Sequence, residues 1–284
     1  MNVNNKSFII DILYSFIARQ EFIFEIILHR IKKCMLKTKK DIDTILAWSV
    51  HLLTCSGLIA GFFALISIFK NEQTLAFLFL GLALLIDAVD GTLARKFKVS
   101  IFVKNIDGKM LDSVIDFFNY IIIPSVMIYW FKFVPTPFEI IIPSIILIIS
   151  AISYSNKNLM TSDNFYKGFP CIWNVLLFYL YLFDLSQTYN LFLISTCILL
   201  KFLPIKFVHP LRVNKYRSYS SVFMILWFIS SFKILLSSFF LLNNYFDYLF
   251  LGIWLISNLY FVSITLYEMY HQLIKNIFVK IIKN

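Results

Sequence analysis

Long apolar stretches dominate this chain, each about 20 residues long and each followed by a short break with charged residues or proline. Residues 138–152 and 221–242 are apolar nearly all round, whereas a surface helix of a soluble protein keeps one polar face. An α-helix of about 20 apolar residues crosses the hydrocarbon core of a bilayer. The pattern therefore predicts about eight transmembrane helices, at 45–69, 74–94, 110–131, 137–154, 171–186, 189–206, 219–242 and 248–269.

The composition supports this pattern and argues against a water-soluble domain. Of the 284 residues, 60% are hydrophobic and 18% are aromatic, and the mean hydropathy is +0.78, well above that of a soluble globular chain. No repeat and no long linker divides the chain. The predicted fold class is therefore all-α, a polytopic membrane helical bundle.

The N-terminal region differs from the rest of the chain. Residues 7–30 mix Phe, Ile and Leu with charged side chains such as Asp11 and Glu21, a mixture that suits a helix lying in the membrane interface. The stretch carries acids and lacks a small-residue cleavage site, so we do not expect a removable signal peptide. We predict an amphipathic interfacial arm at 1–43 and a single transmembrane domain at 44–284.

Basic residues fall on alternate connections between the predicted helices. They gather in 1–43, around 95–109, 157–167 and 206–217, and in the tail at 275–283. The other connections carry almost none, which is the positive-inside pattern for both termini in the cytoplasm. The net charge of +10 is dispersed over these connections, so anionic lipids explain it better than nucleic acid does.

Four aspartates at helical spacing are the main candidate for chemistry. The pattern runs Asp-x2-Asp-Gly-x2-Ala-Arg-x12-Gly-x3-Asp-x3-Asp from Asp87 to Asp116. Asp87 and Asp90 lie three residues apart, and Asp112 and Asp116 four apart, so each pair projects from one helix face. Ionised side chains beside apolar segments are costly and usually functional. Two facing helices would bring the carboxylates together as a site for hard divalent cations.

This pattern resembles the signature of the CDP-alcohol phosphatidyltransferase family. Members exchange the CMP of a CDP-linked lipid or alcohol for another alcohol. The twelve residues between Arg95 and Gly108 lengthen the usual spacer, and this is similar to the bacterial branch whose acceptor is choline. The stretches 167–174 and 207–213 also resemble that branch. The resemblance implies an enzyme that transfers the phosphatidyl group of CDP-diacylglycerol to choline and releases CMP.

The resemblance also implies roles for the aspartates. Asp87, Asp90 and Asp112 would be ligands of two divalent ions, and Asp116 would be both a ligand and the general base. Oxygen ligands favour Mg²⁺ or Mn²⁺, since no His or Cys stands nearby in the sequence.

Several neighbours of the aspartates are candidates for CDP-lipid binding. Gly91 and Ala94 would leave room for the nucleotide, although Gly91, Ala94 and Gly108 could equally serve close helix packing. Arg95 is placed to bind phosphate. Thr54 lies where the family places a small polar contact to the nucleotide, but its hydroxyl could instead bond to its own helix.

The sequence says less about which alcohol accepts the phosphatidyl group than about how the group is transferred. A quaternary ammonium is held by aromatic faces, and the candidates near the cytoplasmic side are Tyr120, Tyr166, Phe169 and Trp173. Each could instead be an interfacial anchor or a packing residue. His209 and Arg212 could bind lipid phosphate, although a positive-inside loop also explains Arg212.

Alternatives in the acceptor and in the class of protein remain open. Serine, inositol or glycerol phosphate would use the same chemistry, and a cation transporter is a remote alternative because its acids would lie near mid-bilayer on several helices. The family resemblance suggests a homodimer. Richness in Lys, Asn, Ile and Phe suggests a bacterial protein, which would place it in the inner membrane with its active site facing the cytoplasm.

Overall fold

The computed structural model describes residues 39–156, 160–240 and 245–283. The predicted arm lies almost wholly outside the described residues. Its last residues already belong to the first described helix, α2. The described elements, in chain order, are α2 (Lys39–Phe69), α3 (Gln73–Lys96), α4 (Val99–Phe102), α5 (Gly108–Phe117), η1 (Phe118–Ile122), α6 (Ile123–Trp130), α7 (Phe138–Ser155), β1 (Tyr166–Lys167), α8 (Trp173–Phe183), α9 (Gln187–Phe202), β2 (Lys206–Phe207), α10 (Arg217–Phe240) and α11 (Tyr245–Lys283).

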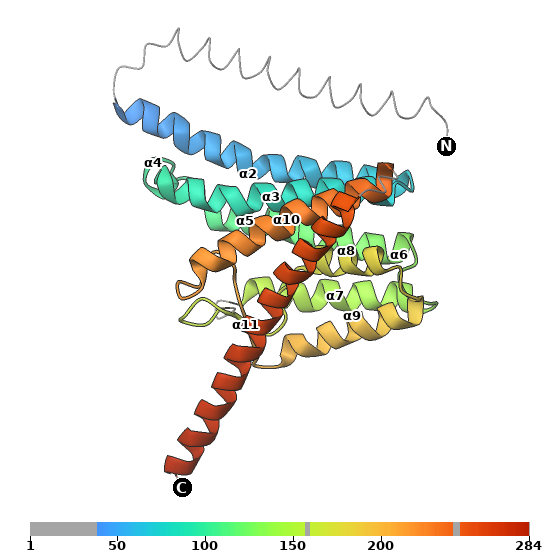
Figure 1. Cartoon of the computed structure of the whole chain (residues 1–284). Helices are drawn as coiled ribbons and strands as arrows, with labels where there is room; N and C mark the ends of the chain where they lie inside the picture. Colours follow the sequence, from blue (N-terminus) through green and yellow to red (C-terminus); the bar gives the residue numbers. More distant parts are fainter. Residues whose placement is uncertain (1–38, 157–159, 241–244, 284) are drawn as a thin grey trace.

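Most of the helices run side by side and α11 crosses them diagonally, an arrangement that confirms the all-α bundle (Figure 1). Within the described ranges, six helical segments are long and apolar enough to cross a membrane. One of them, Gly108–Trp130, joins α5, the π-helix η1 and α6 without a break. The chain is therefore a multi-pass membrane protein.

Two of the eight predicted spans are shorter than expected. The segment 171–186 forms only α8, of 11 residues, and the segment 189–206 forms α9, of 16 residues. At 1.5 Å per residue they extend about 16 and 24 Å, less than the hydrocarbon thickness of about 30 Å. Asp184 explains the early end of α8, because it takes a left-handed conformation with φ of 45°, which interrupts the helix.

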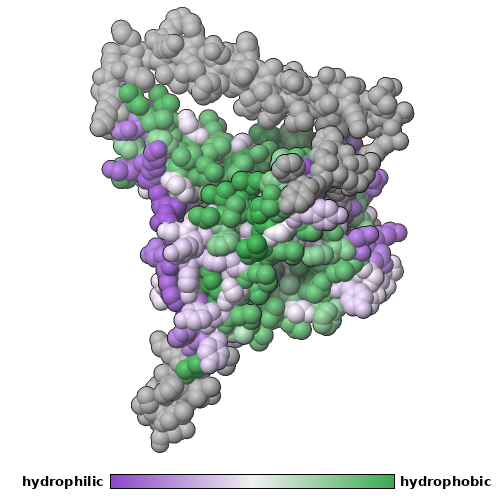
Figure 2. All heavy atoms as spheres, viewed as in Figure 1, coloured by the Kyte–Doolittle hydropathy of each residue, from purple (hydrophilic) through white to green (hydrophobic). Residues whose placement is uncertain are grey.

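Hydrophobic side chains cover the middle of the face seen in Figure 2, between two rims of hydrophilic residues. Large exposed apolar side chains such as Phe62, Ile140 and Ile152 would face lipid, since water would make their exposure costly. The distribution fits a bilayer whose core lies around the middle of the helices.

Close packing of α2 against η1 brings the N-terminal helix onto the centre of the bundle. The Asn119 side-chain amide donates a 3.1 Å hydrogen bond to the Gly57 carbonyl. A side chain at Gly61 would overlap Asn119 and touch Ile123 and Phe118. A glycine at 61 is therefore what lets η1 approach α2.

The segments on either side of α8 and α9 meet in a small polar layer. Residues 166–167 and 206–207 form an antiparallel pair, with Tyr166 opposite Phe207. Gly168 has φ of +75°, and a side chain there would overlap the Lys201 carbonyl. This pairing brings the 204–217 connection back toward the loop before α8.

Candidate metal and substrate site

Three aspartates from two helices converge at one end of the bundle. Asp87 comes from α3, and Asp112 and Asp116 come from α5. One carboxylate oxygen of each lies within 4.8 Å of the other two. Among the described residues, the ion pairs do not include any of these carboxylates. Three converging oxygen donors that make no direct ion pair fit a hard divalent cation.

Local signals bring the two helices to this geometry. After α3, Lys98 takes a left-handed conformation with φ of 50° and the short α4 follows. Asp107 then begins α5, because its carboxylate accepts hydrogen bonds from the backbone amides of Lys109 and Met110. The spacing of four residues then places Asp112 and Asp116 on one face of α5.

Asp90 departs from the expectation of four equivalent ligands. It lines the same small cavity as the other three aspartates, a space of about 200 Å³. However, it is not one of the three whose oxygens converge. Its side chain is only 5% exposed and interacts with Thr54 of α2. Three residues after Asp87 on a helix of 3.6 residues per turn, it points toward α2 rather than directly at α5.

Tyr120 is a site residue that the sequence suggested for a different role. Its hydroxyl donates a 2.8 Å hydrogen bond to Oδ2 of Asp87, and its side chain is 5% exposed. It lies in η1, the π-helical turn that begins two residues after Asp116. Such turns shift the register of the helix and are frequent at functional sites.

The glycine and arginine that follow Asp90 leave open space on α3. A side chain at Gly91 would approach only the Arg95 guanidinium, at 3.8 Å. The Arg95 guanidinium donates a 3.3 Å bond to Thr92 of its own helix and is exposed. Open space at Gly91 supports room for a ligand there more than a role in helix packing.

The other two small residues of the motif have packed surroundings. Ala94 packs against a small cluster formed by Ala47, Val50, Val99 and Val103. A side chain at Gly108 would come within 3.3 Å of the His51 ring. These contacts support the alternative of close helix packing at both positions.

The 204–217 connection contributes two residues from far along the chain. Arg212 interacts electrostatically with Asp87, Asp112 and Asp116. The ring of His209 stacks on that of Tyr166, with centroids 5.2 Å apart. Burial, together with the charges of Arg212 and Arg95, lowers the pKa of His209 to about 4, so it is neutral at physiological pH.

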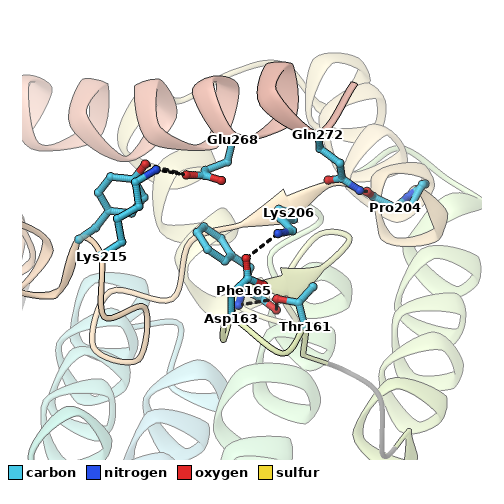
Figure 3. Close-up of polar contacts among 9 residues, drawn as sticks. Thr161, Asp163, Phe165, Pro204, Lys206, Lys215, Glu268 and Gln272 are labelled. Carbon is cyan, nitrogen blue, oxygen red and sulfur yellow. Dashed lines mark hydrogen bonds and ion pairs between the residues drawn. The ribbon is translucent and has the colours of Figure 1, made fainter. Parts of the chain in front are cut away.

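Figure 3 shows what holds this connection in place. The Lys206 ammonium pairs with the Asp163 carboxylate at 2.6 Å. Glu268 of α11 accepts hydrogen bonds from the Lys215 ammonium at 2.9 Å and the Tyr216 hydroxyl at 2.6 Å. Lys215 and Glu268 are far apart in the sequence, and no local pattern could have paired them.

The other three aromatic candidates for choline differ in their surroundings. Tyr166 stacks on His209 and interacts with Asp87 and Asp116. Trp173 is 1% exposed and its indole N–H donates a 2.9 Å bond to Ser150, so it is part of the core. Phe169 packs against Trp173, with centroids 5.3 Å apart.

Sequence reasoning missed one aromatic near the carboxylates. Tyr154 of α7 packs edge-on against Phe117, the residue after Asp116, with ring centroids 5.8 Å apart. It stands far from the motif in the sequence, next to a run of isoleucines and serines. The only feature of the sequence that could have pointed to Tyr154 is its place at the end of an apolar span, just before a basic connection.

The fold and the site together define a polytopic membrane protein whose carboxylate cluster can hold a divalent cation. Residues 49–205 match the family described as CDP-alcohol phosphatidyltransferase. The chain belongs to this family.

Curated relatives carry a name more specific than that of the family, phosphatidylcholine synthase. A phosphatidylcholine synthase of Pseudomonas aeruginosa is 36% identical over 222 residues, which cover 78% of this chain and 91% of the relative. One from Borreliella burgdorferi is 39% identical over 178 residues, covering 63% and 76%. One from Legionella pneumophila is 38% identical over 200 residues, covering 70% and 78%.

Proposed function

We propose that this protein is a phosphatidylcholine synthase that transfers the phosphatidyl group of CDP-diacylglycerol to choline and releases CMP. The observation that carries the proposal is the convergence of Asp87, Asp112 and Asp116 within 4.8 Å. The relatives named above have this activity in their names, and they supply the choice of choline.

The chemistry needs a base for the acceptor and a cationic site for the diphosphate. Asp116 would take the proton of the choline hydroxyl, whose oxygen attacks the lipid-linked phosphorus while the bond to CMP breaks. Asp87, Asp112 and Asp116 would hold Mg²⁺ or Mn²⁺, with Asp90 beside them. Such ions neutralise a diphosphate and polarise its phosphorus.

Basic residues beside the carboxylates would hold the remaining phosphate charge. Arg95 and Arg212 both interact with His209 and so flank the same space. A guanidinium binds phosphate oxygens in pairs. We propose Arg95, with Gly91 and Thr54, for the nucleotide side of CDP-diacylglycerol, and Arg212 for its phosphate.

Among the aromatic candidates, Tyr166 has the best support as part of a choline site. It lies within electrostatic reach of Asp87 and Asp116, and a quaternary ammonium is bound by aromatic faces. Tyr120 already binds Asp87, and Phe169 and Trp173 pack in the core. Tyr166→Leu should therefore raise the KM for choline while leaving that for CDP-diacylglycerol unchanged.

The site would face the cytoplasm. The end of the bundle with the aspartates also carries the connections that are rich in Lys and Arg, which is the positive-inside arrangement. We propose a location in the bacterial inner membrane and a homodimer. Cysteine accessibility at Lys104 in intact cells would test the orientation, and light scattering in detergent would test the dimer.

The first experiment measures CMP release by purified protein with CDP-diacylglycerol and Mn²⁺, offering choline, serine, inositol and glycerol phosphate separately. We expect release with choline alone. Release with another alcohol would overturn the choice of acceptor, and no release with any alcohol would overturn the proposed activity. EDTA should abolish release, and Mn²⁺ or Mg²⁺, but not Zn²⁺, should restore it.

A further inference from the structure

An apolar groove of about 470 Å³ lies between α3, α8 and α10. Its lining includes Leu80, Gly81 and Leu84 of α3, Asn174 of α8 and Trp227 of α10. A side chain built at Gly81 would meet no atom within 4 Å. One wall, α10, follows the part of the chain that matches the family, residues 49–205. The groove is thus partly built by an element beyond the family region.

The groove leads to the candidate site along one face of α3. Leu80, Leu84, Asp87 and Gly91 are spaced at i, i+4, i+7 and i+11, which is one stripe of an α-helix. At 1.5 Å per residue, Leu84 lies about 5 Å from Asp87 along the helix axis and about 10 Å from Gly91. A lipid with its phosphates beside Gly91 and Asp87 would have its chains level with Leu84 and Gly81.

One polar group in the groove lacks a partner. Asn174 is 4% exposed, and its side-chain oxygen is buried without a hydrogen bond among the described residues. Asn174 lies in the first turn of α8, at the end of the helix nearest the basic connections. Rotation of the amide by half a turn exchanges its oxygen and its NH₂ group. An unpaired amide in an apolar groove is costly unless a ligand pairs with it.

We infer that this groove holds an acyl chain of the CDP-linked lipid substrate, and that the Asn174 amide donates a hydrogen bond to its glycerol ester carbonyl. The inference rests on the proposed function. Lipid tails are apolar whether they lie in the bilayer or in the groove, so the groove gains little from the hydrophobic effect. It acts by orienting the chain so that the lipid-linked phosphorus faces Asp116.

Gly81→Leu tests the groove directly, because Gly81 lines it and a Cβ atom there would meet no atom within 4 Å. Gly252→Leu is the matched control, since Gly252 of α11 also has open space around it. With dioleoyl CDP-diacylglycerol, Gly81→Leu should raise the KM at least about tenfold, as expected when a pocket loses room for methylenes. With dihexanoyl CDP-diacylglycerol, both variants should match the unmodified protein.

The chain-length comparison separates this inference from the proposed function. Activity of Gly81→Leu on the short-chain substrate shows that the transfer chemistry is intact. An unchanged KM for both substrates, or an equal loss with both, would overturn the groove. Failure of the unmodified protein with both substrates would instead overturn the proposed function, and activity with the dioleoyl substrate alone would overturn the expected short-chain result.

A second variant tests the ester contact independently and keeps the inference testable if Gly81→Leu does not fold. The unmodified protein should have a lower KM for diester CDP-lipid than for its diether analogue, because the ether lacks a carbonyl acceptor. Asn174→Leu should abolish this preference by raising the KM of the ester alone. An ester preference that persists in Asn174→Leu would contradict the contact.

Discussion

The phenol of Tyr120 donates a 2.8 Å hydrogen bond to Oδ2 of Asp87, and it does so from a π-helical turn on the neighbouring segment of the bundle. Tyr120 is 5% exposed, so its hydroxyl is largely shielded from solvent. The bond fixes the Asp87 carboxylate, which is one of the three that converge in the site. Tyr120 is therefore a positioning residue for a proposed metal ligand, a role that groups behind metal ligands commonly have.

Tyr120→Phe should raise the Mn²⁺ concentration for half-maximal activity by about tenfold, because Asp87 loses the bond that orients it. Metal titration of CMP release measures this change. Tyr181→Phe is the control, since its hydroxyl bonds to Thr74 at the other end of α3. An equal effect of both variants would show that a lost tyrosine hydrogen bond acts through general stability.

Asp116→Asn should lower turnover by about 100-fold or more while CDP-diacylglycerol still binds, because the amide cannot take the proton of the acceptor. Single-turnover CMP release and lipid binding measured separately give the two readouts. Asp107→Asn makes the same chemical change in the same segment. It should retain activity, since asparagine also caps helices well. Turnover retained by Asp116→Asn would exclude this residue as the base.

Stability should depend on His209 when the pH falls. Its pKa is lowered to about 4 in the folded protein and is about 6.5 when unfolded, so between these values the unfolded state binds more protons. The neutral His209 thus contributes stability that is complete above about pH 6.5 and is lost as the pH falls toward 4. When the pH falls from 7 to 5, the melting temperature of His209→Gln should therefore fall less than that of the unmodified protein.

Thermal melts in detergent at the two pH values measure this difference. His271→Gln, which alters an exposed histidine of α11, is the matched variant and should behave like the unmodified protein. An equal pH response in His209→Gln and the unmodified protein would contradict a buried neutral imidazole beside Arg212.

Gly168→Ala should destabilise the loop that carries Tyr166. Its φ of +75° is strained for alanine, and the new methyl group would overlap the Lys201 carbonyl. Backbone strain and overlap of this kind cost about 2 kcal/mol or more. Gly252→Ala, in open space on α11, should instead be neutral or slightly stabilising. Melting temperatures compare the two, and equal values would mean that the loop can rearrange around residue 168.

The predictions from the sequence were accurate where they depended on positions close together in the chain. Apolar runs predicted the helices because the length of a run sets whether it can cross a bilayer. The lengths of two helices were overestimated, those of α8 and α9. For α8, hydropathy does not reveal that Asp184 ends the helix after 11 residues. The family was also correctly predicted, because its motif is local.

What the sequence alone determined is therefore the class of protein and the placement of Asp112 and Asp116 on one face of a helix, since the first follows from the length of the apolar runs and the second from helical periodicity. Tertiary structure decided which carboxylates converge, because packing of α3 against both α2 and α5 pairs Asp90 with Thr54 and leaves Asp87 with Asp112 and Asp116. It also brought Arg212 to the site from a connection held by Glu268 of α11. Such contacts join residues far apart in the chain, where no spacing rule applies and only packing selects the partners.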